Sequence, residues 1–226
     1  MTKNIATLVL VCKRPALHQG KQRLAETIGA EKAFSIAQHL LQCALEDLSD
    51  WAGAVVISPS HSSDVQWSST LLERDFEVVP QSDGNLGKRL NLLDRELRAK
   101  GHNALIYIGS DAPILSNIHF HEILTSLESN DVVFCPSSDG GVTIMACNRT
   151  WPDMTALPWS TDKLGTSLTD LCLENQLSVN HTSPAYDIDI QEHLYRLVRD
   201  LKEDERPARK ALVSEIHQLM KTSYYA

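Results

Sequence analysis

The chain has 226 residues, and its 42% hydrophobic and 22% charged content is ordinary for a globular protein, so we expect one domain over residues 1–226. Its formal net charge of −8 argues against nonspecific nucleic-acid binding, which needs a broad basic surface. No apolar run reaches the length of a membrane span, and no leader with a small-residue cleavage pattern is found, so we expect a cytoplasmic protein.

Segments typical of strands and helices alternate along the chain. Strands are predicted over residues 5–12, 54–57, 76–79, 104–108, 132–135 and 143–147. Helices are predicted over residues 31–48, 65–72, 86–100, 118–127, 163–173 and 192–201, with a C-terminal amphipathic helix at about 206–222. This alternation predicts an α/β fold with a mainly parallel, mixed sheet covered by helices on both faces. Ligands of such sheets bind at the carboxyl ends of the strands, where we expect the polar motifs of this chain to gather.

The first polar motif is a basic stretch between the first predicted strand and the first helix. Lys13, Arg14, Lys21 and Arg23 lie in a segment that contains no acidic residue. A cationic loop at this place suits a polyphosphate, because lysine supplies a point charge, arginine a fork of donors and the backbone further N–H groups. The alternative is a solvated loop with scattered cations.

Three acidic residues are candidate metal ligands. Asp111 comes just after the fourth predicted strand, where a carboxylate can hold Mg²⁺ over the phosphates of a nucleotide. Asp187 and Asp189 share one side of an extended segment, and adjacent like charges need a cation or solvent. The alternatives are helix caps. Ser116 is better placed than Asp111 as such a cap, and a capping Asp189 would leave Asp187 unexplained.

Three further motifs lie at turns or helix starts. The segment 82–89 is either an anion-binding helix start or an ordinary turn with a cap. The simple explanation of segment 139–141 is a β-turn, and that of segment 159–161 is a helix cap with a packed indole ring. The residues concerned are Gly84, Gly87 and Arg89, then Asp139, Gly140 and Gly141, then Trp159, Ser160 and Thr161.

Taken in order, the motifs resemble a bacterial family of glycosyltransferase-A-like (GT-A-like) transferases, part of the nucleotide-diphospho-sugar transferase superfamily. The resemblance covers about residues 5–200, and the opening segment is also similar to phospholactate guanylyltransferases. It implies a single-domain GT-A-like fold. The matching runs are Lys13-x-Pro15, Lys21-x-Arg23-Leu24, Leu86-Gly87-x-Arg89, Ile108-Gly109-Ser110-Asp111-x-Pro113, Asp139-Gly140-Gly141, Trp159-Ser160-Thr161 and Asp187-x-Asp189.

The resemblance also implies a nucleotide pocket at the strand ends, with Lys21, Arg23 and Asp111 as catalytic residues. The implied nucleotide-binding residues are Lys13, Lys21, Arg23, Gly84, Gly87 and Arg89. The implied acceptor-binding residues are Asp139, Gly140, Gly141, Trp159, Ser160 and Thr161. The implied ligands of Mg²⁺ or Mn²⁺ are Asp111, Asp187 and Asp189. The chain departs from the family pattern at His18, Asn85, Val142 and His193, where the family usually has Gly, Asp, Tyr and Asp.

Three functions are compatible with these motifs. The leading hypothesis is Mg²⁺-dependent nucleotidyl transfer, in which a small phosphorylated acceptor attacks the α-phosphorus of a nucleoside triphosphate and pyrophosphate leaves. The cations of the first loop favour it, because a triphosphate needs them most. The second hypothesis is glycosyl transfer from a nucleotide sugar to a small acceptor, with Asp139 as the candidate base. The third, motivated by the four departures, is a non-catalytic nucleotide-binding module.

Overall fold

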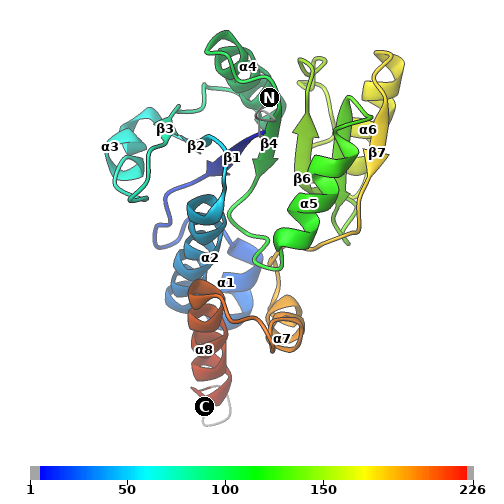
Figure 1. Cartoon of the computed structure of the whole chain (residues 1–226). Coiled ribbons are helices and arrows are strands. Elements are labelled where there is room, and N and C mark those ends of the chain that lie inside the picture. Colours follow the sequence, from blue (N-terminus) through cyan, green and yellow to red (C-terminus); the bar gives the residue numbers. More distant parts are fainter. Residues whose placement is uncertain (1–5, 223–226) are drawn as a thin grey trace.

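A mixed sheet of seven strands forms the centre of residues 6–222, the part of the chain that the computed structural model describes (Figure 1). The strands lie in the order β3-β2-β1-β4-β6-β5-β7, and β6 runs antiparallel to both of its neighbours, whereas the other pairs are parallel. The predicted α/β fold is confirmed. Residues 1–5 and 223–226 of the predicted domain lie outside the described residues. The strands are β1 (Thr7–Cys12), β2 (Val55–Pro59), β3 (Glu77–Val78), β4 (Leu105–Ile108), β5 (Val132–Pro136), β6 (Val142–Cys147) and β7 (Val179–His181).

Helices cover both faces of this sheet, because successive strand residues point to opposite sides and both sides are apolar. Leu8 and Leu10 of β1 pack against α2, α5 and residues near α3, whereas Val9 packs against α4 and α6 on the other face. Within residues 6–222, no helix combines the length and the hydropathy that a bilayer-spanning segment requires. The helices are α1 (Gln22–Ile28), α2 (Ala30–Asp50), α3 (Val65–Ser68), α4 (Leu86–Ala99), α5 (Asn117–Ser126), α6 (Leu164–Glu174), α7 (Gln191–Asp200) and α8 (Pro207–Thr222), with a short 3₁₀ helix, η1 (Ser62–Asp64).

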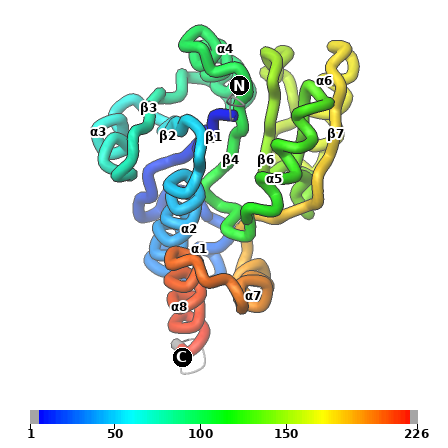
Figure 2. Tube along the Cα trace, in the orientation of Figure 1, coloured from blue at the N-terminus to red at the C-terminus, as the bar shows by residue number. Residues whose placement is uncertain are grey.

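Besides the apolar clusters on the two faces of the sheet, a third cluster joins helices from the beginning and the end of the described chain. The helices α1, α2, α7 and α8 lie together beneath the sheet in the view of Figure 2. Leu40 of α2, Leu197 of α7 and Leu212 of α8 are buried in this cluster. Arg209 of α8 is also fully buried and pairs with Asp47 of α2 at 2.6 Å. The helix α2 is therefore buried on two sides, by the sheet and by α8.

The structure differs from the predicted elements in several places, and the helix α1 is one that was not predicted. The strand β7 was not predicted, because its three residues at the edge of the sheet are mostly polar and show no alternation. The strand β2 continues through Pro59, because the ladder to β1 uses the N–H of Ser60, which donates to the Cys12 carbonyl at 2.8 Å. The helix predicted over residues 65–72 ends at Ser68 and gives way to turns.

Candidate functional site

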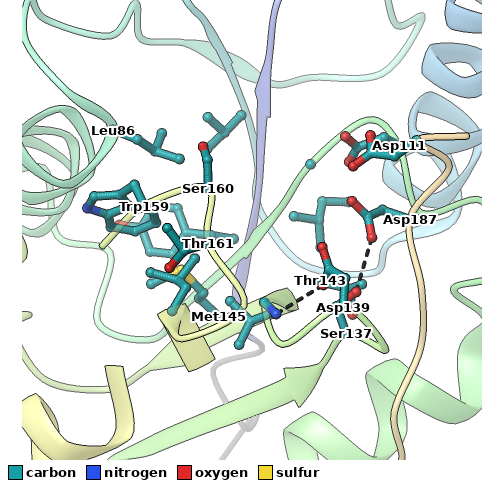
Figure 3. Close-up of a pocket in the computed structure, with 18 of the residues that line it drawn as sticks. Leu86, Asp111, Ser137, Asp139, Thr143, Met145, Trp159, Ser160, Thr161 and Asp187 are labelled. Carbon is teal, nitrogen blue, oxygen red and sulfur yellow. Dashed lines mark hydrogen bonds between the residues drawn. The ribbon is translucent and has the colours of Figure 1, made fainter. Parts of the chain in front are cut away.

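A cavity of about 810 Å³ opens where β1, β4 and β5 end (Figure 3). The start of β6, the loop before α6 and the segment between β7 and α7 form further walls, together with residues at the starts of α1 and α4. The predicted site residues that line the cavity are Lys21, Arg23, Asp111, Asp139, Gly141, Trp159, Ser160, Thr161, Asp187 and Asp189. The predicted site residues outside its lining are Lys13, Gly84, Gly87, Arg89 and Gly140.

Three carboxylates meet on one side of this cavity. One oxygen each of Asp111, Asp187 and Asp189 lies within 4.8 Å of the others, although Asp111 follows β4 and the other two follow β7. A backbone bond joins the two segments, since the N–H of Ile188 donates to the Asp111 carbonyl at 2.9 Å. The Ile188 side chain is fully buried, so the aspartates on either side of it are held with their carboxylates toward the cavity. We call Asp111, Asp187 and Asp189 the acidic cluster.

The ammonium group of Lys21 reaches the acidic cluster from the first loop. Its Nζ lies 3.1 Å from Oδ2 of Asp111 and 3.2 Å from Oδ1 of Asp189, and the lysine side chain is only 13% exposed. Burial alone would lower the pKa of Lys21, but the two carboxylates outweigh it and the pKa is raised. Lys21 therefore carries its charge against the acidic cluster, and does so with a left-handed backbone (φ +47°) just before α1.

Asp187 lies close to other carboxylates, and the ion pairs of Lys21 are with the other two members of the cluster. Burial raises the pKa of Asp187, and so do the neighbouring carboxylates, Asp111 first among them. The Ser137 hydroxyl donates to Oδ1 of Asp187 at 3.0 Å and offsets part of this rise. Carboxylate oxygens gathered in this way suit a hard divalent cation such as Mg²⁺ or Mn²⁺, so the acidic cluster fits a metal ion chemically.

The helix caps proposed as alternatives fall on other residues. Ser116 caps α5 in a capping box with His119, so Asp111 is not needed there. The N-cap of α7 is Ile190, and no side chain caps it, so Asp189 is free of that role. In segment 82–89, Asn85 caps α4 by accepting from the Lys88 N–H at 3.0 Å, which fits the alternative of a turn with a cap, and anion binding at this helix start stays a prediction.

The glycine-rich start of α4 serves packing. A Cβ on Gly87 would lie 2.1 Å from the Met154 carbonyl oxygen, so glycine lets α4 approach the loop before α6. Arg89 donates through Nε to the Gly84 carbonyl at 2.7 Å, which keeps its guanidinium at the turn. The predicted nucleotide-binding roles of Gly84, Gly87, Arg89 and the exposed Lys13 stay predictions, and the described cavity does not include these residues.

The turn between β5 and β6 forms another wall of the cavity. Oδ1 of Asp139 accepts from the Gly141 N–H at 3.0 Å, which makes a tight turn as the simple explanation expected. Gly140 has φ +89°, and a Cβ there would lie 2.1 Å from the carbonyl oxygen of Asp162. The Gly140 carbonyl accepts from the Gly165 N–H at 2.9 Å. The turn is thereby fastened to the start of α6, and its aspartate borders the cavity.

The loop before α6 presents apolar surface to the cavity. The indole Nε1–H of Trp159 donates to the Met154 carbonyl at 3.0 Å, so the only polar atom of this ring is already bonded.

Sequence reasoning missed the other apolar residues of the lining, such as Leu86, Met145 and Leu164. These residues fit the helix and strand periodicity as core positions, so the sequence carried no signal for them. Ser137 was also missed, although a polar residue directly after β5 is a strand-end signal.

Solved structures share this fold. A protein from Desulfovibrio desulfuricans G20, provisionally named a nucleotide-diphospho-sugar transferase, aligns with a TM-score of 0.84 and 21% identity over 96% of this chain and 98% of that one. A cytidylyltransferase from Leptospira borgpetersenii serovar Hardjo-bovis aligns with a TM-score of 0.57 and 13% identity over 97% and 96% of the two chains. CMP:2-keto-3-deoxy-manno-octonic acid synthetase, solved with CTP, aligns with a TM-score of 0.51 and 15% identity over 89% and 100%. At these identities the likeness shows the fold alone, and it confirms the fold that the motif resemblance implied.

Sequence comparison is more specific about the family. No curated protein matches the sequence significantly. The family model described as "Uncharacterized protein conserved in bacteria (DUF2064)" matches residues 38–161, which include α4, β4 with Asp111, the β5–β6 turn and the loop with Trp159. Because this match spans more than half of the chain, the protein belongs to the DUF2064 family.

Proposed function

We propose that the protein is a metal-dependent transferase that uses a nucleotide, and that its reaction is nucleotidyl transfer from a nucleoside triphosphate to a small acceptor. The observation that carries the proposal is the acidic cluster beside Lys21 and Arg23, in a cavity at the carboxyl ends of β1 and β4. The fold supports it, since proteins with this fold include a cytidylyltransferase and a synthetase solved with CTP.

The residues of the chain divide the work as follows. Asp111, Asp187 and Asp189 would hold Mg²⁺ or Mn²⁺, which when bound neutralises charge on the phosphates. Lys21 and Arg23 would bind phosphate oxygens by charge-assisted hydrogen bonds. An acceptor oxygen bonds to the α-phosphorus, the bond from this phosphorus to the bridging oxygen breaks, and pyrophosphate leaves with the electron pair. Where the acceptor group is a hydroxyl, its proton would pass to a carboxylate that lines the cavity, such as that of Asp139. The protein contributes positioning and electrostatic stabilisation.

The second candidate function is glycosyl transfer from a nucleotide sugar. It is favoured by the position of Asp139, which borders the same cavity as the acidic cluster and could accept a proton from the acceptor hydroxyl. The two reactions differ in product, because nucleotidyl transfer releases pyrophosphate and glycosyl transfer releases a nucleoside diphosphate.

The test is a thermal-shift panel of nucleoside triphosphates and nucleotide sugars, each with and without Mg²⁺ or Mn²⁺. We expect a nucleotide and a metal together to raise the melting temperature more than either alone, since ligands that bind the native state stabilise it. The variant Asp187→Asn should lose this shift, and Asp75→Asn, at an exposed position outside the cavity lining, should keep it. If no nucleotide or nucleotide sugar shifts the melting temperature with either metal, the proposal is wrong.

A further inference from the structure

We propose that the acceptor is an uncharged alcohol with an apolar body, and not the phosphorylated compound that the sequence-based hypothesis included. The proposal rests on the proposed function, because it names the chemical class of the second substrate of the same cavity. It follows from two properties of the described lining, the distribution of charge and the position of the apolar side chains.

The charge of the lining leaves no cation for an acceptor phosphate. The basic residues among those that line the described cavity are Lys21 and Arg23, and Lys21 is already paired with two carboxylates of the acidic cluster. A nucleotide donor brings its own phosphates, which need these two cations and a metal ion. Beyond the acidic cluster, the acidic residues of the lining are Asp139 and Asp162. A second phosphate would therefore meet like charge, which disfavours binding.

Apolar side chains form the wall farthest from the acidic cluster. Figure 3 shows Leu86, Trp159 and Met145 on one side of the cavity and Asp111 and Asp187 on the other. These side chains come from α4, β6 and the loop before α6, and the buried Leu164 of α6 adds to the same lining. We call Leu86, Met145, Trp159 and Leu164 the apolar wall. Leu86 is 40% exposed, so a ligand that covers this side chain removes apolar surface from water.

Two hydroxyl groups of the lining, those of Thr161 and Thr143, are occupied by the protein itself, whereas the exposed Ser160 also lines the cavity. Oγ1 of Thr161 donates to the Pro158 carbonyl at 2.8 Å and accepts from the Lys163 N–H at 3.3 Å. Oγ1 of Thr143 donates to the Cys135 carbonyl at 3.3 Å. The O–H groups of these two threonines already donate to backbone carbonyls, as does the indole N–H of Trp159. Apart from the exposed Ser160, a sugar with many hydroxyls would find few unoccupied partners along the apolar wall and would lose hydrogen bonds to water there, whereas an apolar body loses none.

The test compares an alcohol with its own phosphate ester. The probes are 2-phenylethanol, 2-phenylethyl phosphate and glucose, measured by ligand-observed NMR titration, each with and without CTP and Mg²⁺. We expect 2-phenylethanol to bind about tenfold or more tightly than its phosphate ester, because the ester adds charge beside Asp139 and Asp162, and to bind more tightly than glucose. Equal or tighter binding of either the ester or glucose overturns the proposal, and so does failure of 2-phenylethanol to bind.

Two leucines of α4 provide a matched pair of variants. Leu86 lines the cavity and is 40% exposed, whereas Leu92 is 39% exposed and lies outside the lining. We expect Leu86→Ser to weaken 2-phenylethanol binding about fivefold, and Leu92→Ser to leave it unchanged. If Leu86→Ser weakens CTP binding and spares 2-phenylethanol, the apolar wall holds the nucleobase and the proposal fails. The CTP measurements test the proposed function separately, since CTP can bind where the alcohol does not, and the reverse.

Discussion

Lys21 has partners in the structure that its sequence context did not suggest. The sequence suggests a cation offered to phosphates, and the structure places its ammonium group between Asp111 and Asp189. The ammonium group balances the charge of the cluster, and we expect it to compete with a metal ion for the carboxylates of Asp111 and Asp189. A nucleotide that arrives with its metal would leave Lys21 free to pair with phosphate.

The variant Lys21→Met tests this dual role. It keeps the length of the side chain and removes the charge, so we expect the metal-free protein to lose about 1–2 kcal/mol of stability. We expect Mn²⁺ to bind about tenfold more tightly and a triphosphate about tenfold more weakly, measured by calorimetry. Lys202→Met, at an exposed position outside the cavity lining, is the control. Unchanged Mn²⁺ affinity in Lys21→Met would show that the ammonium group does not compete for the cluster.

His119 gives the fold a defined response to acid. Its Nδ1 accepts from the N–H of Ser116 at 3.2 Å in the capping box of α5, and burial lowers the pKa of the ring below the usual 6.5. A lowered pKa means that the folded state prefers the neutral ring. The stability from this cap is therefore present above about pH 6.5, and it is lost as the pH falls from there through the folded-state pKa.

The variant His119→Gln should remove this acid response. Glutamine at the same position can complete a capping box and does not titrate, so the stability of the variant should fall less between pH 7 and pH 5 than that of the wild type, in urea unfolding at ~25 °C. His121→Gln, at an exposed position of the same helix, should keep the wild-type profile. Parallel profiles for wild type and His119→Gln would rule out His119 as the source.

At the scale of elements, α8 holds the loop that carries Asp111. The fully buried Arg209 donates through Nε to the Pro113 carbonyl at 3.2 Å and through Nη2 to the Leu115 carbonyl at 3.3 Å. Arg206, just before α8, donates to the same Leu115 carbonyl at 2.9 Å. The carboxylates of Glu46 and Asp47 on α2 balance these charges. The last helix therefore fixes a loop of the site from outside the cavity.

The variant Arg209→Lys should loosen this loop. Lysine lacks the guanidinium fork and cannot reach both carbonyls, so we expect a stability loss of about 2–4 kcal/mol. We also expect faster hydrogen exchange at the Ile188 amide, which donates to the Asp111 carbonyl. Ser35→Ala is the matched control, because it removes a 2.5 Å bond from α2 to Glu215 of α8 that does not involve the loop. An Ile188 amide equally protected in Arg209→Lys and Ser35→Ala, relative to global stability, would contradict this role.

At the scale of the whole molecule, local patterns predicted the sheet and the strand ends but not long-range contacts. The spacing of Asp187 and Asp189 predicted two carboxylates on one side, and the structure has them so. The buried Arg209 could not be predicted, because its partners lie about a hundred residues or more away in the chain and its own helix looks amphipathic. Trp159 was uncertain for a similar reason, since only the folded chain decides whether an indole ring faces a core or a cavity.

The backbone hydrogen bond between Ile188 and Asp111 joins segments that are far apart in the sequence, so the acidic cluster can form only late in synthesis. Asp111 is synthesised well before Asp187 and Asp189. During that interval the growing chain has one carboxylate of the acidic cluster and lacks the other two. Over the same interval α2 has emerged and α8 has not, and the side of α2 that α8 later covers, with Leu40, is open to water. A chain interrupted before Asp187 therefore lacks a complete acidic cluster and leaves this side of α2 exposed, which makes such a chain prone to aggregate.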